Sequence, residues 1–305
     1  MLQSFKTLPD LIRAFPTEQV AIDHLTAIRW ADGKFCPLCG NADEKRIGTL
    51  TGTNTHKCYV CRKRFSIRVG TIFQDTKLPL RTWFAAIWMI TNHPKGIAST
   101  TLATDLGITQ KTAWFVLHRL RHAARTPSFN GQLGGDGTPV EIDEVAIGGI
   151  LGNMHRADRK EAPPKTLVMG ILERGGELRA GVVDSARNEA LIPIVEHHVA
   201  EGATVYTDSL PTYRVLRHDY QHSSVGHAKG EYVRGDVHTN SIESVWALLR
   251  RQIIGVHHWV SPKHLDRYVG EMTYRFNRRE MAKGDRVNGL LAQIEGPIPY
   301  KVLTA

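Results

Sequence analysis

The chain has 305 residues, of which 42% are hydrophobic and 23% charged, so it is long enough for one large core and one or two smaller modules. We expect a soluble cytoplasmic protein, because there is no signal-peptide pattern and no apolar run long enough to cross a bilayer. The formal net charge of +9 favours a polyanionic partner. All four cysteines lie between positions 36 and 61, which excludes a disulfide framework spread along a secreted chain.

Residues 1–33 are predicted to form two N-terminal helices. Leu8, Leu11 and Phe15 recur at helical spacing before Pro16 interrupts the pattern. Thr17 is a suitable N-cap for a second helix, which continues to about residue 30. Nothing in this segment indicates chemistry.

Residues 34–72 contain two C-x2-C pairs, Cys36 with Cys39 and Cys58 with Cys61. Each pair lies on a predicted tight turn, and two such turns complete a tetrahedral zinc site. Because the segment is too short for a hydrophobic core of its own, metal binding would supply its folding free energy. The segment is also basic, which suits a DNA backbone as well as a solvated face. The DNA-binding candidates are Lys57, Arg62, Lys63 and Arg64.

Residues 77–126 are predicted to be helical throughout. An apolar helix covers 80–92, a short helix covers 99–105, and Gly107 marks a turn before a longer helix capped by Thr109. Helix, glycine turn and helix is the helix-turn-helix pattern, although any helical hairpin has the same appearance. In the DNA-binding interpretation, Gln110 and Lys111 in the first turn of the second helix would contact DNA.

Residues 138–285 have a different composition and predict a mixed α/β domain, followed by a C-terminal tail at 286–305. The order of elements is β-β-β-α-β-α, which is the order of an RNase H-like fold, where the first and fourth strands lie side by side. The expected strands are 140–147, 166–172, 178–183 and 203–207, and the expected helices are 188–200, a helix beginning near 240, and 268–279. Two irregular connections are expected between residue 208 and the helix near 240.

The helix near 240 places three polar side chains on one face. At about 100° per residue, the apolar residues Ile242, Val245, Leu248, Leu249 and Ile253 fall in one arc, and Asn240, Glu243 and Arg250 fall opposite. Asn240 and Glu243 alone would fit a helix cap. Two predicted strands, however, carry Asp143 and Asp208. Two strand aspartates and a helix glutamate fit a two-metal phosphoryl-transfer site, and oxygen-only ligands favour Mg2+ or Mn2+.

Two further acids on the first strand are alternatives within this site. Glu141 shares the face of Asp143 by strand parity, whereas Glu144 points the other way. Asp143 is preferred as the metal ligand because its shorter side chain has less conformational freedom. Glu144 remains a candidate for an assisting role at the site.

The motifs EIDEVAIGG, VYTDS and VHTNSIESVWALLRR, behind a four-cysteine ribbon, resemble the ISXO-like insertion-sequence transposases. The similarity covers about residues 15–280 and includes HLDRYVGEMTYRFNRR. It implies a DDE-type transposase with a zinc ribbon, an RNase H-like core and Mg2+-dependent strand cleavage and joining. By matching motif, Asp143 is the first carboxylate and Asp208 the second. Glu243 fits the third position, with Arg250 where such enzymes carry a helper cation, and Asn240 is the alternative third residue.

The resemblance implies an enzyme that binds double-stranded DNA at the terminal inverted repeats of its element and at a target site. It also implies a homo-oligomer, dimer or higher, assembled on nucleoid DNA and independent of membranes. One alternative is a zinc-ribbon and helix-turn-helix regulator whose nuclease-like core is inactive. A second is an RNase H-like nuclease for RNA or repair junctions, which would share the site but not the two DNA-binding modules.

Overall fold

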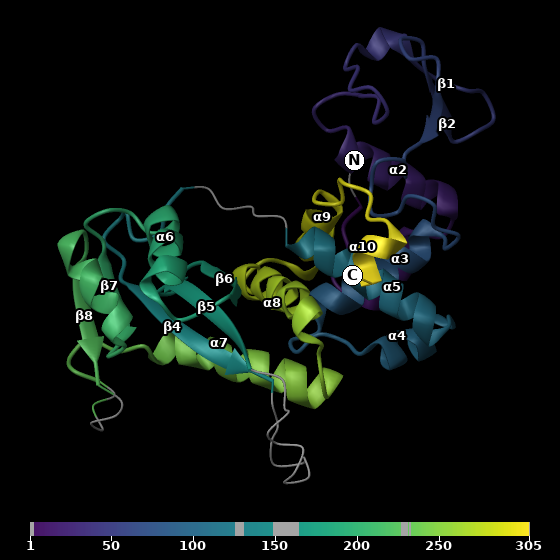
Figure 1. The fold of residues 1–305 in the computed structure, drawn as a ribbon. Coiled ribbons are helices and arrows are strands. Elements are labelled where there is room, and N and C mark those ends of the chain that lie inside the picture. Colours follow the sequence, from purple (N-terminus) through teal and green to yellow (C-terminus); the bar gives the residue numbers. More distant parts are fainter. Residues whose placement is uncertain (1–2, 126–130, 149–164, 227–230, 232, 305) are drawn as a thin grey trace. The chain divides into compact units, whose positions relative to one another are not determined.

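The computed structural model describes residues 3–125, 131–148, 165–226, 231 and 233–304. The chain forms two compact units (Figure 1). The first comprises residues 1–126 together with 278–305, and the second comprises residues 127–277. Within the described ranges, no helix has the length and apolar character needed to span a membrane.

The helices of the first unit gather around the apolar helix α3, whose Trp83, Phe84 and Ile87 are buried. Thr17 caps the second N-terminal helix as the sequence predicts, because its side chain accepts the Val20 N–H. Thr7 and Asp10 form a reciprocal capping box at the start of the first. The helices are α1 (Leu8–Ala14), α2 (Glu18–Arg29), α3 (Leu80–Asn92), α4 (Ser99–Leu106), α5 (Gln110–Ala124), α9 (Lys283–Leu291) and α10 (Tyr300–Thr304).

The C-terminal segment differs from the expected tail. α9 packs on α3, and it also lies against the N-terminal segment, where a Cβ added at Gly284 would lie 2.6 Å from the Phe5 carbonyl oxygen. Residues from 278 onward therefore group with the first unit, and the expected boundary at 285 falls inside α9. The apolar residues of α9, Val287, Leu290 and Leu291, become buried only in this packing, which sequence periodicity over so short a helix does not reveal.

The predicted pair of helices at 99–124 is present as α4 and α5. Gly107 ends α4 in the left-handed conformation with φ 63°, where glycine has no steric penalty. Thr109 then caps α5 by accepting the Thr112 N–H. The turn between the helices thus follows from the two residues that the sequence singles out.

The zinc-ribbon segment is a small antiparallel sheet in the order β1-β2-β3, following the short 3-10 helix η1 (Glu44–Arg46). Trp30 at the end of α2 contacts the ring of His56 edge-on, with centroids 4.7 Å apart. Arg29 of the same helix donates to the Ile67 carbonyl oxygen at 2.7 Å. The strands are β1 (Ile47–Thr49), β2 (Thr55–Cys58) and β3 (Arg64–Ser66).

The second unit contains a five-stranded mixed sheet in the order β6-β5-β4-β7-β8. β4 pairs antiparallel with β5 and parallel with β7, so the first and fourth strands are neighbours, as the element order predicts. The strands are β4 (Val140–Ile147), β5 (Thr166–Glu173), β6 (Leu178–Val183), β7 (Thr204–Asp208) and β8 (Gln221–Val225). The expectation of two irregular connections after residue 208 is wrong for β8 and for the 3-10 helix η4 (Pro211–His218).

Helices cover both faces of this sheet (Figure 1). On one face, Leu191 and Val195 of α6 (Asn188–His198) share a core with Ile142 of β4. On the other face, α7 (Asn240–Gln252) and α8 (Pro262–Asn277) share a core with Val145 and Ile147. α7 continues into η6, a π-helical turn (Ile253–His257). The alternation along β4 therefore sends Glu141 and Asp143 toward α7 and Glu144 toward the opposite face.

Candidate functional site

Asp143 and Asp208 lie on adjacent parallel strands. The register pairs Glu141 with Tyr206 and Ile142 with Thr207, so its next step places Asp143 beside Asp208. Asp208 is the last residue of β7, where its Oδ1 accepts the Leu210 N–H at 2.9 Å. The two aspartates thus meet at the edge where parallel strands end, which is where ligand sites form in open α/β sheets.

A tryptophan of α7 holds the side chain of Asp143. The Trp246 Nε1–H donates to Asp143 Oδ2 at 2.9 Å, and the indole is buried. Gly170, which pairs with Asp143 across β5, makes room for this ring, because a Cβ there would lie 2.6 Å from it. The indole N–H of Trp246 thereby orients one oxygen of Asp143. Because the indole is neutral, it does not neutralise the negative charge of the carboxylate.

Asp143 lies in a partly buried environment together with two other acids. Burial, and then the charges of Asp208 and Glu243, raise the pKa of Asp143 to about 6 although hydrogen bonds oppose the shift. Asp208 and Glu243 therefore lie close enough to Asp143 to repel its negative charge, and a bound cation would relieve that repulsion. The donor set of carboxylate oxygens therefore fits a hard divalent ion.

α7 exposes the three polar residues that the sequence assigns to one face. Asn240, Glu243 and Arg250 are exposed, while Ile242, Val245 and Leu249 are buried against the sheet. Among the described residues, the set of three or more candidate ligands whose donor atoms all lie within 4.8 Å is the four cysteines. The carboxylate oxygens of Asp143, Asp208 and Glu243 are therefore not as close to one another as the four cysteine sulfurs are.

Asn240 does not cap α7. The helix begins at Asn240, and Thr239 is the N-cap residue without a side-chain cap hydrogen bond. The Glu243 N–H donates to the Thr239 carbonyl oxygen at 3.1 Å, and the Thr239 hydroxyl donates to Glu243 Oε1 at 3.4 Å. The interpretation of Asn240 and Glu243 as a capping pair is therefore wrong.

Glu141 supplies the anion at the start of α7 instead. Its carboxylate is fully buried and accepts the Ile242 N–H and the Ser241 hydroxyl, each at 3.0 Å. The Arg174 Nε completes an ion pair with it at 2.7 Å. Glu141 lies on the face of Asp143, as parity predicts, but these partners occupy it. The sequence does not reveal that Glu141 forms this ion pair, because Arg174 lies in a hairpin turn that is far along the chain from Glu141 and from α7.

Glu144 faces the other side of the sheet, as predicted. The hydroxyl of Tyr213, a buried residue of η4, donates to Glu144 Oε1. Burial raises the pKa of Glu144 to about 7, and the charges of Asp143 and Asp208 add to this shift against the Tyr213 hydrogen bond. Glu144 is thus close enough to sense both aspartates while its side chain is engaged elsewhere.

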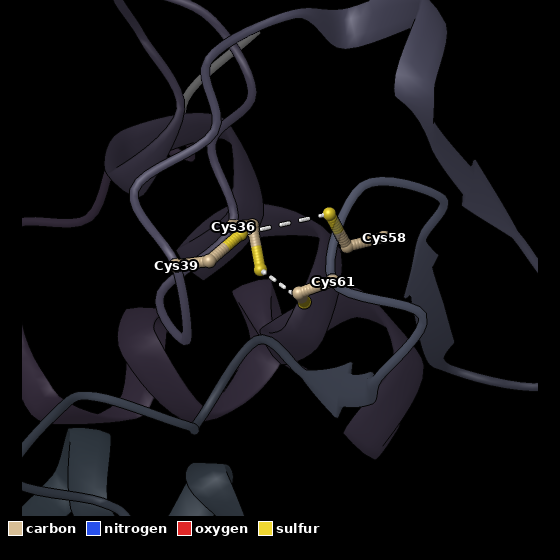
Figure 2. A group of neighbouring side chains, drawn as sticks. All are labelled: Cys36, Cys39, Cys58 and Cys61. Atoms are coloured by element: carbon tan, nitrogen blue, oxygen red, sulfur yellow. Dashed lines mark hydrogen bonds between the residues drawn. The ribbon is translucent and has the colours of Figure 1, made fainter.

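The four cysteines form a cluster between two turns. Figure 2 shows their side chains pointing toward one another, with Sγ–Sγ distances of 3.9 Å between Cys36 and Cys61 and 3.8 Å between Cys39 and Cys58. A backbone hydrogen bond from the Cys61 N–H, aided by Val60, lowers the pKa of Cys58 to about 7 although burial opposes it. Thiolates stabilised by turn N–H groups are the ligands of structural zinc sites, so this set fits Zn2+.

The predicted DNA-binding side chains are exposed on the first unit. Arg62, Lys63 and Arg64 are exposed in and after the second cysteine turn, where Arg62 adopts φ 61°. Lys57 is half-buried, with its Nζ 5.3 Å from the ring centroid of Tyr59. On α5, Lys111 is exposed, and the Gln110 side-chain amide donates to the Ser99 hydroxyl at 2.9 Å.

Comparison with known proteins identifies both parts of the chain. Residues 132–277 match the ISXO2-like transposase domain, and residues 16–64 match the transposase zinc-ribbon domain. An "uncharacterized protein in transposable element ISH50" from Halobacterium salinarum is 30% identical over 268 residues, covering 82% of this chain and 86% of that protein. An "uncharacterized transposase-like protein" from Haemophilus influenzae is 26% identical over 101 residues, or 33% of this chain and 80% of the relative. No solved structure matches the chain. A four-cysteine ribbon, a mixed sheet with paired aspartates and a relative from a transposable element together place the chain in the family of ISXO2-like insertion-sequence transposases.

Proposed function

We propose that the protein is an active DDE-type transposase that binds the terminal inverted repeats of its element and catalyses metal-dependent DNA strand cleavage and strand transfer. The observation that carries this proposal is the pairing of β4 with β7, which brings Asp143 and Asp208 together beneath α7. Membership of the transposase family supports the same reaction class. The proposed substrate is double-stranded DNA of the element ends and of a target site, bound by a dimer or larger assembly on the nucleoid.

Asp143, Asp208 and Glu243 would hold one or two Mg2+ or Mn2+ ions. The bound cation supplies Lewis-acid stabilisation of the charge that develops on the scissile phosphate. Trp246 orients one oxygen of Asp143 toward its own N–H, which leaves the other oxygen for the ion. Arg250 lies on the exposed face of α7 with Glu243, where its guanidinium would bind a phosphate of the substrate.

The direct test is nicking of duplex DNA that carries the ends of the element, with Mg2+, with Mn2+ and with a chelator. Cleavage at the ends that requires the divalent ion and appears only with the correct sequence supports the proposal. Sequence-specific binding without cleavage under any of these conditions would favour the regulator with an inactive core. Metal-dependent cleavage of RNA in preference to duplex DNA would favour the RNase H-like nuclease.

The third ligand is tested by comparing Glu243→Gln with Asn240→Ala. We expect Glu243→Gln to lower the cleavage rate by orders of magnitude, because the change removes a negative charge that Asp143 senses. Since Asn240 makes no cap, Asn240→Ala should cost about 0.5 kcal/mol or less of stability and leave cleavage largely intact. Single-turnover cleavage and thermal unfolding measure both effects. Cleavage lost in Asn240→Ala and retained in Glu243→Gln would move the third position to Asn240.

DNA binding by the first unit should weaken steeply with salt, since its candidate contacts are exposed cations. We expect Lys63→Ala to reduce the slope of log affinity against log salt by about one. Lys111→Ala should change sequence preference if Lys111 meets a base, and the salt slope if it meets a phosphate. Fluorescence anisotropy with specific and scrambled duplexes measures both quantities, and Lys283→Ala on α9 is a matched exposed-lysine control. A DNA affinity that does not change with ionic strength would contradict phosphate contacts by these cations.

A further inference from the structure

An ion pair between the buried carboxylate of Glu141 and the half-buried guanidinium of Arg174 joins the three elements that carry the candidate acids. Glu141 lies two residues before Asp143 on β4, and its carboxylate accepts the Ile242 N–H one residue before Glu243 on α7. The contact to Ile242 is a helix N-terminal contact, where a carboxylate meets unpaired N–H groups and the positive end of the helix dipole. Glu141 therefore connects the strand of the first acid to the helix of the third.

Arg174 extends this connection to β7 and to the segment before α7. Its Nε bonds to Glu141, and its Nη2 donates to the carbonyl oxygen and to Nδ1 of His238, both at 3.0 Å. The guanidinium carbon also lies 4.8 Å from the ring centroid of Tyr206, which pairs with Glu141 across the sheet and stands two residues before Asp208. One guanidinium thus contacts β4, β7 and the segment that leads into α7.

The protonation of this junction follows from its contacts. His238 Nδ1 accepts from Arg174, which places the ring proton on Nε2. His238 Nδ1 and Glu141 Oε1 lie 3.4 Å apart, and both atoms accept hydrogen bonds from the guanidinium of Arg174. The junction therefore pairs the buried Glu141 carboxylate with the half-buried Arg174 guanidinium, and His238 is a second acceptor for the same guanidinium.

Stability alone does not account for such a pair. A buried ion pair is often no more stabilising than apolar side chains of similar volume, because both charges lose their hydration. Its geometry, however, is specified by directional hydrogen bonds, whereas apolar contacts let a helix slide or tilt. In this unit, the hydrogen bonds of Glu141 and Arg174 fix the position of the first turn of α7 relative to β4 and β7.

We propose that Glu141 is a positioning residue that, through Arg174 and the first turn of α7, sets the distance from Glu243 to Asp143 and Asp208 and so sets divalent-metal affinity. The inference rests on the proposed function in taking Glu243 as the third ligand. It predicts that breaking the junction harms metal binding more than its effect on folding explains.

The test is Mn2+ binding to the zinc-loaded full chain by calorimetry, for wild type and Glu141→Gln, alongside thermal unfolding. We expect Mn2+ affinity to fall by about 10- to 100-fold in Glu141→Gln, the range found for residues that orient metal ligands. Glu271→Gln is the matched control, since it breaks the buried pair with Arg275, which contacts Gln252 at the other end of α7. This control should lose stability and retain Mn2+ affinity.

A second variant removes the risk that Glu141→Gln leaves the half-buried Arg174 without its carboxylate partner and prevents folding. Glu141→Gln with Arg174→Met removes both charges and should show the same loss of Mn2+ affinity.

A double-mutant cycle separates positioning from a general defect. If Glu141 acts through Glu243, adding Glu141→Gln to Glu243→Gln should weaken Mn2+ binding little further. Additive losses, or equal Mn2+ affinities in Glu141→Gln and Glu271→Gln, would overturn the inference while wild-type binding and cleavage leave the proposed function standing. A wild-type chain that neither binds Mn2+ nor nicks its DNA would overturn both.

Discussion

Asp143→Asn and Asp208→Asn should each lower strand cleavage and strand transfer by at least about 100-fold, while DNA binding stays near the wild-type level. Both residues are near-neighbours at the end of the β4–β7 pair, and each substitution removes the charge of a proposed metal ligand with little change in side-chain volume. The DNA-binding candidates lie on the other unit, so docking of the duplex should persist. Gel-shift binding and single-turnover cleavage of the same labelled duplex measure the two effects together.

The fold of Asp143→Asn is checked by the pH dependence of stability. Burial raises the pKa of Asp143 from 3.8 to about 6, so the protein carries extra stability below pH 4 that is lost as pH rises through 6. Above pH 6, the ionised Asp143 costs the metal-free protein about 2–3 kcal/mol. Asp143→Asn should therefore be at least as stable as wild type at pH 8 without metal, with a flatter profile between pH 4 and 7. Lost activity together with lower stability at pH 8 would point to misfolding and contradict the catalytic assignment.

The pairing of the two aspartates could be predicted because it depends on element order. Once Asp143 stands in the first strand and Asp208 ends the fourth, an RNase H-like order of elements places those strands side by side, and the sheet order confirms that they are neighbours. The exposed face of α7 was also predictable, since its apolar period is strong enough to fix which side is buried. Local sequence patterns of this kind predict where the acids lie, but they do not predict which residues contact the acids.

The partners of the acids depend on contacts that no local pattern carries. Trp246 looks in the sequence like one more apolar residue of α7, and its bond to Asp143 exists only because Gly170 on a third element leaves space for the indole. Glu141 was assigned to the correct face, yet its ion pair with Arg174 comes from the β5–β6 turn. β8 was missed for a simpler reason: the sequence QHSSV has little apolar character, and the strand lies at the edge of the sheet, where one neighbour suffices.

Cys58→Ser should abolish stoichiometric zinc binding and unfold the ribbon around the cysteine cluster. Three β-strands of three or four residues bury too little surface to fold alone, so a bound metal would supply the folding free energy, on the order of 10 kcal/mol in small zinc domains. Cys58 is the ligand whose pKa the turn N–H groups lower to about 7, and serine offers a far more basic oxygen in its place.

Zinc content by mass spectrometry and limited proteolysis of the same samples measure this outcome. New cleavage should be confined to about residues 34–72, and the thermal transition of the second unit should be unchanged, because its core contains none of these residues. Val60→Ser is the matched control: it introduces the same residue two positions along the same turn, at a side chain that is 52% exposed, and keeps all four thiols. Zinc retained in Cys58→Ser at one ion per chain, or lost equally in Val60→Ser, would contradict a four-cysteine site.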